Sequence, residues 1–238
     1  MKHFKPTTRM SDIIHTNYLL LPVINRFGVR LGFGDKVVEE VCREKKLNAG
    51  FFLAILNAYH DPDYFPEKEL QGFSTHLIID YLKKTHDYYR EYVIPKVETD
   101  LENLMGECRG NCRNLKLIRS FYDEYKVELI NHLNEEDTRV FPYMTDLQRV
   151  YDKEIPMADK VRNFSIRNFE DEHTDIDNKL FDLKNIIIKY LEPQYDDNMC
   201  NAFLYAIFQL EQDLIDHARI EDKILVPKIM SIEKAVKS

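Results

Sequence analysis

Apolar residues recur every three or four positions along four long segments of the chain, which is the spacing of one helical face. Leu117, Phe121 and Tyr125 lie in the clearest of these runs. Pro95 falls inside the first segment and is expected to kink that helix. Four long helices with short connections predict an all-α fold, an antiparallel four-helix bundle. Glycines or prolines separate the segments, which span about residues 74–107, 114–148, 156–191 and 197–234.

The first 60 residues predict a separate group of shorter helices. One helix is expected from about residue 11 to 26, and the following stretch, 27–34, holds three of the seven glycines and predicts a turn. Asp35 and Asn48 are the expected N-caps of two further helices. Residues 61–72 hold two prolines and several charges, and they predict a linker. The sequence therefore predicts a small helical N-terminal domain, residues 1–65, and a bundle domain, residues 66–238.

Composition and charge narrow the range of functions. The 33 basic and 41 acidic residues give a net charge of −8 without a basic block, which argues against nucleic acid as a partner. No apolar run is long enough to predict a membrane span, and polar residues interrupt the short apolar stretch near the start, so no signal peptide is expected. Four cysteines do not make a disulfide framework in a chain of this size, and we expect a reducing, cytoplasmic location.

A repeated segment carries the candidate chemistry. Residues 129–142 (LINHLNEEDTRVFP) and 214–227 (LIDHARIEDKILVP) align without gaps. Each copy has a histidine followed four residues later by a glutamate, and a proline ten residues after the histidine. Positions i and i+4 share one helical face, so both side chains of each copy can reach one metal centre. The ligand candidates in the two copies are His132, Glu136, His217 and Glu221.

The other two long segments add one histidine each, His86 and His173. Four imidazoles and two carboxylates in a bundle core suit two transition-metal ions, iron or manganese, with coordination positions left open. The remaining histidines, His3, His15, His60 and His76, are interpreted as ordinary residues and are not predicted ligands. Metal-bound imidazoles need an acceptor for the second ring N–H. Candidate acceptors are Asp87, Asn131, Asp177 and Asp216. Three further acidic residues next to the ligand glutamates are expected to point off the ligand face, and they are interpreted as solvated or as supporting residues rather than ligands: Glu135, Asp137 and Asp222.

These motifs resemble the hemerythrin-like proteins and, more closely, the di-iron proteins of iron–sulfur cluster repair. Residues 74–238 resemble the hemerythrin-like bundle, and residues 1–60 resemble the N-terminal domain of the repair group. The resemblance implies two non-heme iron ions, bridged by the two glutamates and by an oxo or hydroxo group. Oxygen-carrying hemerythrins have a further histidine where this chain has Asp177, which favours the repair group. The ligands that the resemblance implies are His86, His132, Glu136, His173, His217 and Glu221.

One departure from the repair group concerns its N-terminal Cys-Cys pair. Gly32 and Phe33 stand in the matching positions, and Cys42 on the following helix is no obvious substitute. Cys108 and Cys112 lie in the connection between the first two long helices. They are interpreted as ordinary thiols, with a redox pair that replaces the missing cysteines as the alternative.

The resemblance implies a role in nitric-oxide or oxidative stress. The first hypothesis is iron–sulfur cluster repair by donation or exchange of iron, with iron–sulfur proteins as clients. The second is a sensor that binds NO or O2, and reduction of NO at the di-iron centre is its enzymatic variant. A scaffold that has lost its metals is the third, and six retained polar ligands argue against it. A homodimer is compatible with each of the three.

Overall fold

The computed structural model describes residues 2–107, 113–157, 165–166, 173–191 and 195–237, and for residues 173–178 it describes the backbone alone. Nearly all of the described chain is helical, and the only β-type pairing in these residues is an isolated bridge between Arg9 and Val37. The predicted all-α fold is confirmed. None of the described helices is both long and apolar enough to cross a membrane.

The chain folds into two compact units. One unit runs to Lys84 and includes Lys223–Leu225, and the other comprises Thr85–Asp222 and the residues from Val226 onward. This division falls within one continuous helix, α6 (Thr75–Tyr88). The predicted domain boundary between residues 65 and 66 stays a prediction.

The first unit is built from short helices, as predicted, but the details differ. The helix expected from residue 11 to 26 is two helices with a 3-10 turn between them. The break lies at Asn17, which is extended (φ −151°) and accepts a hydrogen bond from the Leu19 N–H through its side chain (3.1 Å). The helices here are α1 (Met10–Thr16), α2 (Leu21–Arg26), α3 (Val38–Lys45) and α4 (Ala49–His60).

The predicted N-caps have different outcomes. Asn48 caps α4 as predicted, because its side chain accepts the Phe51 N–H at 3.0 Å. Asp35 does not cap α3, which begins three residues later. There the Val37 N–H donates to the Glu40 carboxylate at 3.0 Å, so a glutamate in the first turn takes the role expected of Asp35. The predicted linker contains the short helix α5 (Glu67–Gln71).

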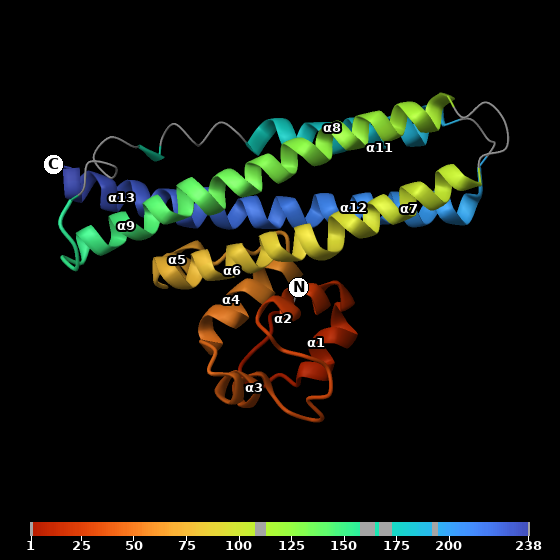
Figure 1. Ribbon diagram of the computed structural model, residues 1–238. Coiled ribbons are helices and arrows are strands. Elements are labelled where there is room, and N and C mark those ends of the chain that lie inside the picture. Colours follow the sequence, from red (N-terminus) through yellow and green to blue (C-terminus); the bar gives the residue numbers. More distant parts are fainter. Residues whose placement is uncertain (1, 108–112, 158–164, 167–172, 192–194, 238) are drawn as a thin grey trace. The chain divides into compact units, whose positions relative to one another are not determined.

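The second unit is an up-and-down helical bundle (Figure 1). The first bundle helix continues from α6 into α7, the second is α8 with α9, the third is α11, and the fourth is α12 with α13. Packing pairs α7 with α12, α8 with α11, α9 with α13 and α11 with α12. The bounds are α7 (Ile94–Gly106), α8 (Arg113–Glu135), α9 (Phe141–Tyr151), α11 (His173–Tyr190), α12 (Asp197–Ile220) and α13 (Val226–Lys237).

Within the described residues, three of the bundle helices contain one π-helical turn each: η2 (Tyr89–Val93), η3 (Glu136–Val140) and η5 (Glu221–Leu225). A proline follows each turn at the second position of the next helix: Pro95, Pro142 or Pro227. Proline lacks the N–H of a regular helical bond, so the preceding residue bonds to the carbonyl five residues back instead. The predicted disturbance at Pro95 therefore takes the form of a π-turn.

The start predicted for the third bundle helix, near Pro156, is wrong. Residues 152–157 are not helical, and the described helix starts at His173 rather than near Pro156. The chain leaves α9 through Lys153, which adopts a left-handed conformation (φ 61°) that ends a helix. The apolar spacing that follows Pro156 therefore did not locate the beginning of this helix.

Large aliphatic and aromatic side chains fill most of the bundle interior. The core includes Leu101, Leu129, Leu133, Phe203 and Leu210, all nearly inaccessible to solvent. This apolar filling isolates any polar group placed at the same depth from water. Burial of charge is therefore costly in this bundle unless the charges pair or bind an ion.

Candidate metal centre

Four of the six predicted ligands meet in the interior of the bundle. His86 from α6, Glu136 from η3, His217 from α12 and Glu221 from η5 are all buried. One ligand atom of each lies within 4.8 Å of the corresponding atom of every other. Carboxylate and imidazole side chains are rarely buried together without a compensating charge. The cluster therefore has the composition of a cation site.

The distances show how the side chains converge. Nε2 of His86 lies 3.2 Å from Nε2 of His217 and 3.2 Å from a Glu136 carboxylate oxygen. Nε2 of His217 lies 3.2 Å from a Glu221 oxygen. Because N and O ligands bind an ion such as zinc at about 2.0–2.2 Å, the ligand atoms of one ion lie within about 4.4 Å of one another. The cluster therefore fits a bound transition metal after small adjustments of its side chains.

The two remaining predicted ligands differ in what the structure describes. His132 on α8 lies outside the group of four, but its Nε2 is 3.3 Å from the second oxygen of Glu136, and only 10 % of its side chain is exposed. His173 is the first residue of α11, and its side chain lies outside the described part of the structure. The structure thus brings five predicted ligands to one region.

The π-turns account for the placement of both glutamates. Glu136 and Glu221 are the first residues of η3 and η5, and each accepts, through its backbone carbonyl, the N–H of the residue five positions later. A π-turn widens the helix by one residue and commonly occurs at functional sites. The prolines of the sequence repeat therefore position these glutamates, since they favour the π-turn that precedes them.

An aromatic ring packs against each of the two imidazoles in the cluster. Phe141 stacks on the imidazole of His86, with ring centroids 5.4 Å apart. Tyr89 meets the imidazole of His217 edge to face at 5.8 Å. These rings keep water away from the imidazoles and limit the orientations that they can adopt.

One of the residues interpreted from the sequence as solvated or supporting, Asp137, contacts the cluster. Asp137 lies 3.0 Å from Nδ1 of His86, and its other oxygen accepts a hydrogen bond from Arg90 at 2.6 Å. Burial lowers the pKa of His86, but hydrogen bonds to Asp137 and Glu136 outweigh burial and raise it to about 9. Burial raises the pKa of Asp137, but the hydrogen bonds and charges of His86 and Arg90 hold it below its ordinary value.

Two of the acceptors expected from the sequence, Asp87 and Asp216, have other partners. The exposed side chain of Asp87 faces Arg90 at 3.8 Å. Asp216 accepts from Gln212 and Arg219, and Nδ1 of His217 is buried without a hydrogen-bond partner among the described residues. Asp177 lies outside the described side chains. The sequence contained one signal for Asp137, its position directly after the predicted ligand Glu136. In a regular helix, however, that position points about 100° away from the ligand, so the residue was not assigned to His86.

The two cysteines that the structure describes are both buried. Burial raises the pKa of the Cys42 thiol to about 11, so this thiol is a packing group and not a reactive one. Cys200 is also buried and free. Cys108 and Cys112, the predicted loop thiols, lie outside the described residues.

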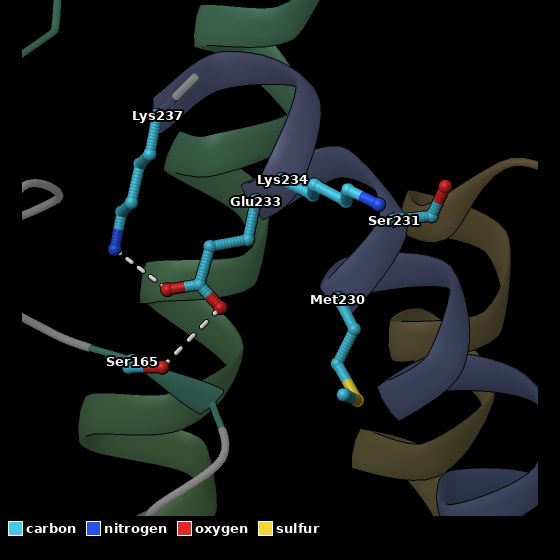
Figure 2. A pocket seen from close by; sticks show the side chains of 6 residues that line it. All are labelled: Ser165, Met230, Ser231, Glu233, Lys234 and Lys237. Carbon is cyan, nitrogen blue, oxygen red and sulfur yellow. Dashed lines mark hydrogen bonds and ion pairs between the residues drawn. The ribbon is translucent and has the colours of Figure 1, made fainter.

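A pocket elsewhere in the bundle includes none of the predicted ligands. Ser165, Met230, Ser231, Glu233, Lys234 and Lys237 line it. Figure 2 shows the Glu233 carboxylate between Lys237 and Ser165, which contact it at 2.6 and 3.5 Å. Tyr143 of α9 also donates to this carboxylate at 3.0 Å. Glu233 is therefore satisfied by partners from within the bundle, and its role is structural.

Comparison with known proteins agrees with this geometry. Residues 77–229, more than half of the chain, match the family model described as the hemerythrin HHE cation binding domain. The chain belongs to the hemerythrin family. It is also 21 % identical over 227 residues to the iron-sulfur cluster repair protein ScdA of Staphylococcus haemolyticus (strain JCSC1435). The aligned region covers 92 % of this chain and 96 % of that protein. The resemblance drawn from the sequence is confirmed, and this hemerythrin-family chain carries a cation-binding domain.

Proposed function

We propose that this hemerythrin-family protein holds two iron ions and that the two glutamates bridge them. Four of the proposed ligands lie within 4.8 Å of one another, and this buried group is the observation that carries the proposal. The contact between His132 and Glu136 at 3.3 Å supports a fifth. The full set of proposed ligands is His86, His132, Glu136, His173, His217 and Glu221.

The bound irons would supply Lewis-acid and one-electron chemistry, with open positions for a diatomic gas such as NO or O2. The protein contributes the surroundings. Glu136 and Glu221 supply negative charge inside an apolar bundle, which makes the site selective for cations. Phe141 and Tyr89 pack against two of the imidazoles and exclude water from them.

We propose iron–sulfur cluster repair, by donation or exchange of iron, as the function of the protein. The support is the name of the Staphylococcus relative, whose similarity extends over both the N-terminal helices and the bundle. The partners would be damaged iron–sulfur proteins, and the compartment the cytoplasm. Repair needs iron that the site can release, and histidine and carboxylate ligands release iron by dissociation of their coordination bonds, with no other bond of the protein broken.

The first test is the iron content of protein produced with added iron and purified without chelator. About two irons per chain are expected from six ligands. The second test mixes this loaded protein with an enzyme whose iron–sulfur cluster has been damaged by NO. Recovery of enzyme activity, with matching loss of iron from the protein, supports repair. Close to zero iron in folded protein would overturn the metal proposal, and full iron without any recovery would overturn repair alone.

The second candidate is a sensor that binds NO or O2, and the observation that favours it is the replacement of the cysteine pair by Gly32 and Phe33. Gly32 has a φ of +96°, a conformation that a cysteine adopts only with strain. A sensor would show a reversible spectral change with NO while it keeps its iron. N2O formed under reducing conditions would identify the enzymatic variant.

A further inference from the structure

The imidazole of His86 is contacted at both ring nitrogens by two consecutive residues of the second bundle helix. Glu136 lies 3.2 Å from Nε2, and Asp137 lies 3.0 Å from Nδ1. Successive residues of a regular helix point about 100° apart, so one helix rarely presents two neighbours to the same ring. Here both residues belong to the π-turn η3, and the ring lies between them.

Arg90 fixes Asp137 from the other side. Its guanidinium donates to the second carboxylate oxygen of Asp137 at 2.6 Å. Arg90 lies four residues after His86, in the π-turn η2, so the histidine and the arginine approach Asp137 from the same helix. Each oxygen of Asp137 thus has one partner, and the carboxylate cannot leave His86 without breaking its contact with Arg90.

We propose that Asp137, held by Arg90, is a positioning residue that keeps a proton on Nδ1 of His86 and directs Nε2 toward the metal. This inference rests on the proposed metal centre, and it adds two residues to it. A ligand histidine coordinates through one nitrogen only if the other is protonated and oriented. Asp137 accepts the proton's hydrogen bond, and Phe141 stacks on the face of the same ring.

The alternative is that Arg90 and Asp137 merely tie two helices together. The chain offers a matched pair for comparison: Lys126 of α8 and Glu98 of α7, which are 2.5 Å apart. The two pairs are similarly exposed, at 25 % and 21 % for Arg90 and Asp137 and 24 % and 25 % for Lys126 and Glu98. Both pairs join the first and second bundle helices, but only the first touches a predicted ligand.

The experiment measures the affinity of metal-free protein for Fe(II) by competition with a chelator. We expect Asp137→Ala to lose about 10–100-fold in affinity, the usual cost of removing the partner of a ligand histidine. Asp137→Asn keeps an acceptor oxygen and should lose less than Asp137→Ala. The control variant Glu98→Gln removes an equivalent ion pair and should bind Fe(II) like the wild type. A purely structural ion pair would instead give equal effects for Asp137→Ala, Asp137→Asn and Glu98→Gln.

A spectroscopic readout tests the position of the proton itself. In protein loaded with Zn(II), which is diamagnetic, the Nδ1–H of His86 should give a slowly exchanging downfield proton resonance. That resonance should persist in Glu98→Gln and disappear or exchange rapidly in Asp137→Ala. Its persistence in Asp137→Ala would overturn the proposal.

Two outcomes separate this inference from the proposed function. A wild type that binds neither Fe(II) nor Zn(II) would overturn the metal centre itself. A wild type that binds both metals, but no more tightly than Asp137→Ala does, would overturn only the positioning role. If Asp137→Ala does not fold, Asp137→Asn and Arg90→Met decide the question: reduced affinity in both supports the proposal, and wild-type affinity in both contradicts it.

Discussion

The second and fourth bundle helices carry the same sequence repeat in different surroundings. In both copies, a π-turn begins at the glutamate and a proline follows it. In the second helix, His132 lies at the edge of the cluster, and Asp137 is half-buried against His86. In the fourth helix, His217 lies within the cluster, and Asp222 is exposed. The repeat therefore determines the backbone, whereas neighbouring helices determine how each copy contributes to the site.

The largest effect is expected where the two copies are most alike, at the glutamates. Glu136→Ala or Glu221→Ala should each reduce bound iron from about two ions to about one or fewer, because a proposed bridge contributes to both ions. Metal analysis by mass spectrometry measures this loss, and circular dichroism checks that the helices remain. Full loading with two irons in both variants would contradict the bridging roles.

The histidines of the two copies should respond unequally. His217 shares the buried group with His86 and both glutamates, whereas His132 reaches that group at Glu136. We expect His217→Ala to lose more than about 100-fold in Fe(II) affinity, beyond the usual cost of changing a supporting residue. His132→Ala should lose less. Chelator competition measures both affinities, and equal losses would show that metal binding makes the two copies equivalent.

A third contrast concerns the aspartates that follow the glutamates. Asp222 occupies the repeat position of Asp137, but its side chain is exposed. Asp137 is held by Arg90, which lies four residues after His86. The position four residues after the third-helix histidine, His173, is Asp177 rather than an arginine. Water competes for an exposed carboxylate, so Asp222→Ala should reduce Fe(II) affinity by less than about 10-fold, the lower end of the range for supporting residues. The Fe(II) titration used for Asp137→Ala measures it. A loss as large as that of Asp137→Ala would extend the supporting role to the fourth helix.

Apolar spacing predicted the bundle. The repeated segment, together with the histidines of the other two long segments, predicted the ligands, of which His86, Glu136, His217 and Glu221 meet. The sequence did not identify Asp137 as the partner of His86. A single-helix projection says which way a residue points but not which neighbouring side chain stands there, and it assumes a regular helix. The π-turn at Glu136 departs from that assumption.

Helix ends were the other source of error. Asp35 has the right chemistry for an N-cap, but the Glu40 carboxylate accepts the Val37 N–H and places the start of α3 later. The third bundle helix does not begin near Pro156, because the left-handed Lys153 ends α9 and residues 152–157 are not helical. Local hydrogen bonds and backbone conformation decide where helices begin, and apolar spacing does not report them.

The smallest expected effect lies beyond the prolines, where the two copies continue into α9 and α13. Tyr143 of α9 and Lys237 of α13 both hydrogen-bond to Glu233. Burial raises the pKa of Glu233, but these hydrogen bonds outweigh it and hold the pKa below its ordinary value. A carboxyl group with a lowered folded-state pKa stabilises the protein above its unfolded-state pKa, and this contribution disappears as the pH falls through the folded-state value.

Glu233→Gln should therefore lower the melting temperature of metal-free protein at neutral pH by about 2–4 °C, which corresponds to a loss of about 1 kcal/mol in the free energy of unfolding. The difference from the wild type should vanish in acid, and iron content should not change. Glu128→Gln is the control, because Glu128 pairs with Lys179 on the surface, where an ion pair contributes little. Thermal unfolding followed by circular dichroism between neutral and acidic pH measures both variants. A difference that persists in acid, or that Glu128→Gln reproduces, would show that the contact between α9 and α13 does not depend on the charge of Glu233.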